Sequence, residues 1–238
     1  PVPTALFSAH TRYEVFTFHD TTEILDGYLD AWRQENVDLD GVYSGFLGSA
    51  DQVAIIKRLY AEYPHALRLV DPVMGDGGEI YATYTPELCR AMGTLVDGAD
   101  ALMPNLTEAS ILTGRDYPGQ DIDDAQVDEI LGALLAAGAK NVVLKGIEHG
   151  DGLIHNYVWG DAIDFTETTN AKLPYMLHGT GDVFASTLLA AVMAGRDLAE
   201  ATAFATKHIL DHMRDNGVRI DRLIGVGGIA QKSPFVMQ

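Results

Sequence analysis

Apolar residues follow two different periods along most of this chain. Short, mostly apolar runs of the kind that form buried strands occur five times. They predict strands over Val2–Ser8, Leu39–Ser44, Leu67–Val73, Ala101–Met103 and Asn141–Lys145. Between these runs the apolar residues recur at helical spacing. Helices are expected to open at Asp20 with Glu23 and at Ser49 with Gln52, and to cover Pro86–Val96, Asp124–Ala137, Asp182–Ala194 and Leu198–Asn216. This alternation predicts an α/β fold with a mostly parallel central sheet covered by helices.

Two segments depart from the alternation. Residues 151–168 contain two strand-like stretches around Gly160–Asp161 and predict an antiparallel hairpin. Residues 9–19 are aromatic and follow the first predicted strand, so we expect them to form a short flap. Internal repeats and linkers are not recognisable in the sequence. We therefore expect a single domain over residues 1–238.

Charge and cysteine content narrow the class of partner. The chain has 34 acidic and 16 basic residues and a formal net charge of −18, which argues against binding to nucleic acid or anionic membranes. A polyanionic substrate would be repelled by this negative charge, and magnesium or backbone N–H groups would be needed at its site to offset the repulsion. Apolar runs stay below the roughly 20 residues needed to cross a bilayer. The single cysteine, Cys89, cannot form an internal disulfide, which favours a reducing, cytoplasmic setting.

Candidate chemistry collects after the predicted strands. In open parallel sheets, ligands bind beyond the carboxyl ends of the strands. The residues found there are Ser8, His10 and Thr11, then Gly45, Phe46 and Gly48, then Asp71 to Asp76, then Pro104 to Glu108, and finally Lys145 and Gly146. Polar and glycine positions are thus predicted to share one edge of the sheet.

The most specific motif is His178-Gly179-Thr180-Gly181-Asp182, which runs directly into an apolar helix. Glycines before a helix allow successive N–H groups to point at one spot, where the helix dipole favours an anion. Asp182 is a candidate general base, but an acid in a first helical turn is also a common stabilising residue. Other acidic turns on the same predicted edge favour the catalytic interpretation.

Three further positions allow both a structural and a functional interpretation. Asn105 and Glu108 can form a capping box, or they can reach one metal-bound water or phosphate. Asp71 and Asp76 flank a glycine-rich turn that is either an ordinary acidic turn or a magnesium site. Lys145 is either a solvated lysine or a contact to a nucleotide phosphate. A P-loop motif of the Gly-Lys-Ser/Thr type is absent from the sequence, so any phosphate must be bound by a different structural element.

Taken together, HGTGD before a helix, DPVMGD at 71–76, PNxxE at 104–108 and FSAHTRY at 7–13 resemble the pyridoxal kinase branch of the ribokinase-like superfamily. The resemblance extends from residue 1 to about residue 216. It implies a three-layer α/β/α fold and transfer of the γ-phosphate of ATP to the 5′-hydroxymethyl group of pyridoxal, pyridoxine or pyridoxamine. It also implies magnesium, with a monovalent cation such as K⁺ as a further candidate, and a homodimer.

The resemblance assigns roles residue by residue. Asp182 would take the proton of the hydroxymethyl group, and the N–H groups of Gly179, Thr180, Gly181 and Asp182 would hold the transferring phosphoryl group. The remaining assignments are Asn105 and Glu108 for magnesium and its waters, Asp76 near the metal, Asp71 near the phosphates, Lys145 at the nucleotide, and Phe7, His10, Thr11 and Phe46 around the pyridine ring, with residues 9–19 as the flap.

Several positions depart from the family pattern. Ala9 stands where Asn is usual, Phe46 where Tyr is common, and Met103 where Thr often precedes the Pro-Asn pair. The family's first strand and a substrate-contacting turn would lie upstream of Pro1, so we expect a further N-terminal segment. The main alternative is a hydroxymethylpyrimidine kinase, but such enzymes commonly carry Cys where this chain has Asp182. A sugar kinase suits the motifs less well, and a binding protein without turnover is a further alternative.

Overall fold

The computed structural model describes residues 2–9, 14–119, 121–161, 163–172 and 179–215. Its main sheet has six strands in the order β10-β9-β8-β7-β4-β3. Four of them are mutually parallel, namely β3 (Gly41–Ser44), β4 (Leu67–Val70), β7 (Ala101–Leu102) and β8 (Asn141–Ile147). The strands β9 (Leu153–Gly160) and β10 (Ile163–Ala171) add the antiparallel hairpin expected over 151–168. The predicted α/β class with a mostly parallel sheet is confirmed.

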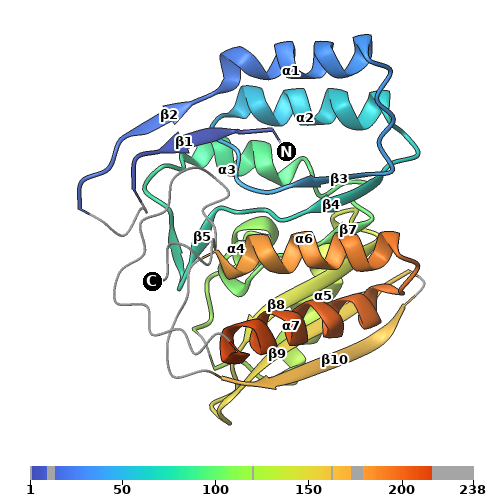
Figure 1. The fold of residues 1–238 in the computed structure, drawn as a ribbon. Helices are drawn as coiled ribbons and strands as arrows, with labels where there is room; N and C mark the ends of the chain where they lie inside the picture. The colour runs from blue at the N-terminus through green and yellow to red at the C-terminus, as the bar shows by residue number, and fades with distance from the viewer. Residues whose placement is uncertain (1, 10–13, 120, 162, 173–178, 216–238) are drawn as a thin grey trace.

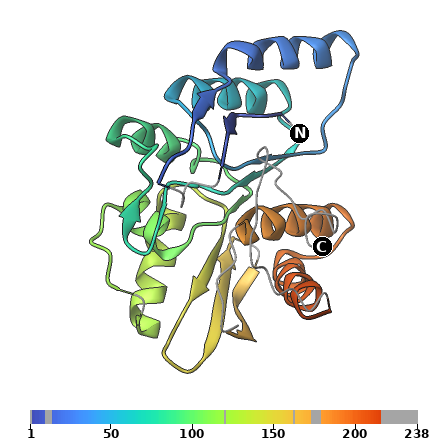
Figure 2. The same cartoon turned by 60° about the vertical axis from the view of Figure 1, so that its left-hand side comes forward.

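Helices cover both faces of this sheet, and Figure 2 shows the sheet between them. One face packs against α6 (Thr180–Met193) and α7 (Leu198–Asp215) through a buried cluster that includes Leu69, Val143 and Leu188. Helices on the other face pack with the sheet into a larger core. These helices are α1 (Thr22–Gln34), α2 (Ala50–Glu62), α3 (Pro86–Gly93), α4 (Leu106–Thr113) and α5 (Asp124–Ala136). In Figure 1, α1 lies outside α2, at the opposite end of the molecule from the β9–β10 hairpin.

The first predicted strand is shorter than expected and lies in a different sheet. Residues Ala5–Phe7 form β1, which pairs antiparallel with β2 (Phe18–Asp20) in a separate two-stranded ribbon. Leu6 is 47% exposed, because a two-stranded ribbon can bury only one face. The ribbon is fixed by Thr4, whose hydroxyl donates to the Phe46 carbonyl at 2.6 Å. The expectation that Ser8 follows a central strand is therefore wrong.

Helix starts follow local sequence signals closely. Ser49 caps α2 and accepts from the N–H of Gln52, as predicted. For α1 the expected capping residue is wrong by one position, because the N-cap is Thr21 while Asp20 accepts from the N–H of Thr22 at 2.7 Å. The segment after β4 also holds a small hairpin that the sequence did not indicate, formed by β5 (Gly75–Asp76) and β6 (Glu79–Ile80).

Within the described residues, no helix is long and apolar enough to cross a membrane.

Candidate active site

The carboxyl ends of the parallel strands bring the predicted polar residues to one edge of the sheet. Asp71 directly follows β4, and its N–H donates to the Ser44 carbonyl at the end of β3 at 2.9 Å. On the other side of β7, the N–H of Lys145 in β8 donates to the Pro104 carbonyl at 3.0 Å. These bonds continue the sheet ladder past the C-terminal ends of β4 and β7. They hold Asp71 and Lys145 in register with each other.

Asp71 and Lys145 form a largely buried ion pair. Lys145 Nζ lies 2.5 Å from Asp71 Oδ1, and the two side chains are only 16% and 2% exposed. Burial lowers the pKa of Lys145, but the negative charges of Asp71 and Glu108 outweigh burial and leave the pKa above its ordinary value. The ammonium group therefore stays charged. The interpretation of Lys145 as a solvated loop residue is wrong.

The N-terminus of α6 faces this ion pair. A methyl group added at Gly181 would lie 3.7 Å from Asp71 Oδ2 and 3.9 Å from Lys145 Nζ. The N-cap is Gly179, which has a φ of 82° and no side chain to cap the first turn. Such a φ strains any residue with a Cβ atom, so glycine suits this turn. The positive end of the helix dipole is thus directed to the same place as a lysine ammonium, an arrangement that favours an anion.

Asp182 lies in the first turn of α6 and meets a residue from a distant part of the chain. The hydroxyl of Tyr43, in β3, donates to Asp182 Oδ1 at 3.2 Å. The pKa of Asp182 is raised, first because surrounding protein removes water from the carboxyl group and then because Asp71 is negatively charged. The Tyr43 hydrogen bond and the charge of Lys145 act in the opposite direction.

Asn105 and Glu108 form the capping box of α4, and their side chains also reach the neighbouring loop. Asn105 Oδ1 accepts from the N–H of Glu108 at 2.9 Å, and Glu108 Oε2 accepts from the N–H of Asn105 at 2.8 Å. Glu108 Oε1 also accepts from the N–H of Met74 at 3.3 Å, and Asn105 Nδ2 donates to the Gly75 carbonyl at 2.9 Å. The capping interpretation is confirmed, and both side chains also tie α4 to the acidic turn.

Glu108 is 2% exposed, and this burial raises its pKa to about 8. The nearby charge of Lys145 lowers the pKa and that of Asp71 raises it, while two backbone N–H groups stabilise the charged form. A buried carboxyl group with a pKa close to neutral is typical of a functional site. Its protonation state should respond to any cation that binds nearby.

The glycine-rich turn after Asp71 places Asp76 at the surface. Asp76 is exposed in β5, and its Oδ1 accepts from the N–H of Gly77 at 2.9 Å. The N–H of Gly78 donates to Thr107 Oγ1 at 2.8 Å, which fixes the turn against α4. A small hollow of about 40 Å³ lies between this turn and β8. It is lined by Asp76, Asn105, Leu106, Thr107, Tyr117, Gly146 and Ile147.

Metal ligands are not gathered into a closed cage in the described part of the chain. Among those residues, no three His, Cys, Asp or Glu side chains come close enough to hold a metal ion on their own. Magnesium usually takes only one or two carboxylates together with phosphate oxygens and water. Glu108 and Asp76 supply the oxygen donors that such an ion prefers.

An aromatic cluster surrounds two of the predicted substrate residues. The ring centroids of Phe7 and Phe46 lie 5.5 Å apart at an angle of 73°. Phe18 and Tyr84 extend the cluster, with centroids 5.0 Å from Phe7 and 5.6 Å from Phe46 respectively. Phe46 follows β3, the strand that also carries Tyr43. His10 and Thr11, and His178 of the glycine-rich motif, lie outside the described residues.

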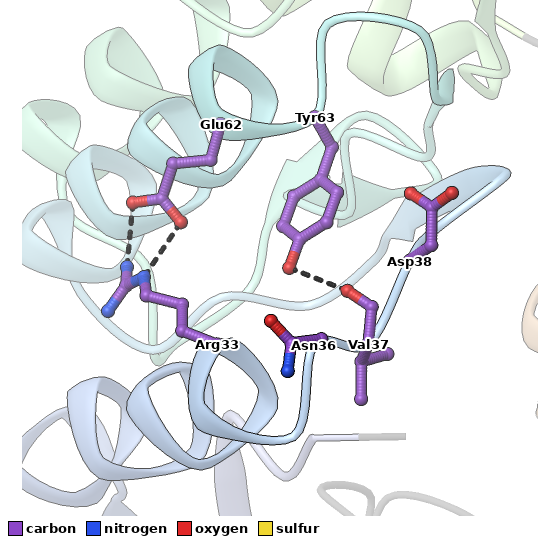
Figure 3. Close-up of a pocket in the computed structure, with 6 residues that line it drawn as sticks. All are labelled: Arg33, Asn36, Val37, Asp38, Glu62 and Tyr63. Atoms are coloured by element: carbon purple, nitrogen blue, oxygen red, sulfur yellow. Dashed lines mark hydrogen bonds and ion pairs between the residues drawn. The ribbon is translucent and has the colours of Figure 1, made fainter.

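A larger surface hollow of about 500 Å³ lies elsewhere, at the C-terminal ends of α1 and α2 (Figure 3). It is lined by Arg33, Asn36, Val37, Asp38, Glu62 and Tyr63. Arg33 is already held by Glu62, with Nη2 2.7 Å from Oε1, and the Tyr63 hydroxyl donates to the Val37 carbonyl at 3.0 Å. The predicted site residues are not among those lining this hollow.

Sequence reasoning missed Tyr43, Tyr84 and Thr107. Tyr43 and Tyr84 meet their partners Asp182 and Phe46 through the tertiary fold, so local patterns carry no signal for them. Thr107 could have been noticed, because it lies inside the Asn105–Glu108 motif and its hydroxyl faces the glycine-rich turn.

The fold and the site together define an α/β protein in which the N-terminus of a helix lies beside a buried lysine–aspartate pair at the strand-end edge of the sheet. Residues 2–227 match the model of the phosphomethylpyrimidine kinase family. The chain belongs to this family of kinases.

Individual relatives share most of the chain. The chain is 31% identical over 220 residues to the pyridoxal kinase PdxY of Pseudomonas fluorescens, covering 86% of this chain and 73% of that protein. It is 29% identical over 170 residues to the hydroxymethylpyrimidine/phosphomethylpyrimidine kinase of Haemophilus influenzae, covering 69% of this chain and 61% of that protein.

Solved structures confirm the fold. A Bacteroides thetaiotaomicron protein, described as a candidate phosphomethylpyrimidine kinase and solved with pyridoxal, has a TM-score of 0.84 and is 32% identical, covering 91% of this chain and 77% of that one. Pyridoxal kinase from Lactobacillus plantarum has a TM-score of 0.81 and is 28% identical, covering 95% of this chain and 81% of that one.

Proposed function

We propose that this kinase transfers the γ-phosphate of ATP to the 5′-hydroxymethyl group of a B6 vitamer, with Asp182 as the general base. The observation that carries the proposal is the juxtaposition of the Asp182 carboxyl, the positive end of α6 and the buried Asp71–Lys145 pair. A proton acceptor and an anion-binding device are thereby held beside each other. Phosphoryl transfer depends mainly on such positioning and charge stabilisation.

In the proposed step, Asp182 accepts the proton of the hydroxymethyl group while the hydroxyl oxygen bonds to the γ-phosphorus. The bond between that phosphorus and the oxygen bridging it to the β-phosphate breaks, and ADP leaves. The N–H groups of Gly179, Thr180 and Gly181 would stabilise the charge on the transferring group. Lys145 would contact a nucleotide phosphate, and Asp71 would hold the Lys145 ammonium in place.

Magnesium is proposed to bind with the nucleotide. When bound, it would neutralise part of the phosphate charge. Glu108 and Asp76, with Asn105 beside them, would hold the ion or its waters. A carboxyl group that is buried and has a raised pKa gains most from a divalent cation, because the cation offsets the electrostatic cost of ionising it.

The aromatic cluster supports the choice of a flat, heteroaromatic substrate. Phe7 and Phe46 present ring faces and edges, against which a pyridine ring can stack. The relatives also favour a B6 vitamer as the substrate, since a pyridoxal kinase is 31% identical over most of the chain. A pyrimidine bearing a hydroxymethyl group is the second candidate, favoured by the family model and by the Haemophilus relative.

An ATP-consumption assay with separate acceptors tests this proposal. Pyridoxal, pyridoxine, pyridoxamine and hydroxymethylpyrimidine would each be supplied with magnesium and ATP, and the phosphorylated product identified by mass. We expect turnover with at least one B6 vitamer at a higher kcat/KM than with hydroxymethylpyrimidine. Turnover of the pyrimidine alone would replace the leading candidate with the second, and ATP consumption with none of the four would refute both.

A further inference from the structure

Tyr43 contacts Asp182 through its hydroxyl group. It lies in β3, where alternate side chains point to opposite faces of the sheet. Ser44, its neighbour, faces the α2 side, where its hydroxyl lies 3.1 Å from that of Tyr60. Tyr43 faces the α6 side, packs against the cluster that includes Phe184 and Leu188, and reaches Asp182.

The phenol ring of Tyr43 is held over the backbone of Gly45. A methyl group added at Gly45 would lie 2.8 Å from the Tyr43 hydroxyl oxygen and 3.2 Å from Cζ, both closer than ordinary packing allows. The absence of a Cβ atom at Gly45 is what lets the ring fold back along the strand. The hydroxyl is thereby fixed beside α6 by the strand itself.

The surroundings of the Tyr43 hydroxyl keep it protonated. Burial raises its pKa well above the ordinary value, and the negative charges of Asp71 and Asp182 raise it further. The group can therefore act only as a hydroxyl, and it donates its proton to Asp182 Oδ1. This donor favours the charged carboxylate and opposes the effect of burial on Asp182.

We infer that Tyr43 is a positioning residue for Asp182: its hydroxyl fixes the orientation of the carboxylate through Oδ1 and leaves Oδ2 directed to the substrate hydroxyl. This inference rests on the proposed role of Asp182 as the base. General-base catalysis requires a base that is correctly oriented as well as one with a suitable proton affinity. Tyr43 would provide the orientation. Under this inference, the loss of the Tyr43 hydroxyl affects proton transfer and leaves the binding of ATP unchanged.

The test compares Tyr43→Phe with the wild type and with Tyr60→Phe. A hydrogen bond to a charged group is worth about a tenfold effect or somewhat more, so kcat with the best B6 vitamer should fall about 10-fold in Tyr43→Phe. KM for ATP should stay unchanged. The acid limb of the pH profile of kcat/KM should move to higher pH, because the carboxylate loses a donor. Tyr60→Phe removes a buried hydroxyl that packs against the other face of β3, and it should leave the pH profile in place.

A second measurement does not depend on the substrate. In protein labelled with ¹³C at the aspartate carboxyl groups, the Asp182 signal can be identified by its loss in Asp182→Asn and then titrated without ligands. We expect its midpoint to lie at higher pH in Tyr43→Phe than in the wild type or Tyr60→Phe. An unchanged midpoint together with an unchanged kinetic limb would overturn the inference. A wild type that phosphorylates no B6 vitamer would refute the proposed function, while the titration would still decide the Tyr43–Asp182 contact.

Discussion

Two regions of this molecule bring carboxyl groups together around one cationic side chain, and they differ in how far those carboxyl groups are buried. Among the described residues at the strand-end edge, the carboxyl groups of Asp71, Glu108 and Asp182 all interact with the ammonium group of Lys145. In the β9–β10 hairpin, His155 lies between two carboxylates, with Nδ1 2.5 Å from Glu167 Oε1 and Nε2 3.1 Å from Asp151 Oδ2. In the described part of the chain, carboxyl groups outnumber the cationic group in both regions, but Asp71 and Glu108 are buried, whereas Glu167 and Asp151 are 41% and 42% exposed.

In the hairpin network, both ring nitrogens of His149 and of His155 have a hydrogen-bond partner. Both ring nitrogens of His155 face carboxylates, which favours the doubly protonated ring. The neighbouring ring of His149 lies 4.6 Å away, centroid to centroid. His149 Nδ1 donates to the Ile122 carbonyl at 2.6 Å, so its Nε2 accepts from the Tyr157 hydroxyl, also at 2.6 Å. These partners define a fixed arrangement that needs no ligand.

The contrast separates a structural network from a ligand-binding one. A buried polar network with every partner present stabilises and specifies the fold. An excess of buried carboxyl groups costs stability until a cation binds or a proton is taken up. The raised pKa of the buried Glu108 carboxyl group expresses this cost. We therefore expect substitutions at the strand-end edge to affect activity, and those at the hairpin to affect only stability.

The largest effect is expected for Asp182→Asn. The amide keeps the size and the hydrogen-bonding contact to Tyr43 but cannot accept a proton, so kcat should fall by about 10²–10⁴-fold. Steady-state kinetics with the preferred acceptor measure this. Asp197→Asn is a matched control, because Asp197 accepts from the N–H of Glu200 at 2.8 Å at the start of α7. If Asp182→Asn behaved like Asp197→Asn and retained full activity, Asp182 would be only a helix-stabilising residue.

The next effect concerns the ion pair. Lys145→Met leaves the Asp71 carboxylate buried without its partner, and it should lower the free energy of unfolding by roughly 3 kcal/mol. Urea denaturation measures this change. The double variant Lys145→Met/Asp71→Asn should regain part of the stability, because the buried Asp71 charge is gone while Glu108 and Asp182 still lack the ammonium group, yet it should remain inactive. Equal stability of the single and double variants would show that the pair is not electrostatically coupled.

Glu108 should make the unliganded protein less stable at higher pH. Its folded-state pKa of about 8 lies above the unfolded value. Its protonated form therefore contributes stability that is fully present below the unfolded pKa and is lost as the pH rises toward 8. The loss between pH 5.5 and 8 should be on the order of 3 kcal/mol, because each pH unit between the unfolded and folded pKa values contributes about 1.4 kcal/mol. In Glu108→Gln the free energy of unfolding should not decline between these pH values. Urea denaturation at pH 5.5 and at pH 8 measures this, and a decline that persists in the variant would show that Glu108 is not its cause.

Sequence periodicity and the strand-end rule predicted the frame of the molecule and much of the site. Asp71, Asn105 and Lys145 follow or end neighbouring parallel strands, so topology alone brings them together. The contact between Tyr43 and Asp182 could not be predicted, because it joins residues 139 positions apart through packing of α6 on β3. Strand β1 was misassigned for a related reason. A short apolar run does not reveal which partner strand it will pair with.

The smallest effect is expected for His155→Gln, which tests the hairpin network. Burial lowers the pKa of His155, but the hydrogen bonds to Glu167 and Asp151 outweigh it, so the pKa is raised. The contribution to stability is therefore fully present below the unfolded pKa and is lost as the pH rises through the folded one. At pH 6 the variant should lose about 1 kcal/mol of unfolding free energy, and this difference should shrink at higher pH. Within the residues that the structure describes, no hydrogen bond or ion pair joins this network to Asp71 or Lys145, so kcat should stay at the wild-type value. A fall in kcat greater than the loss of folded protein would show that the two regions are coupled.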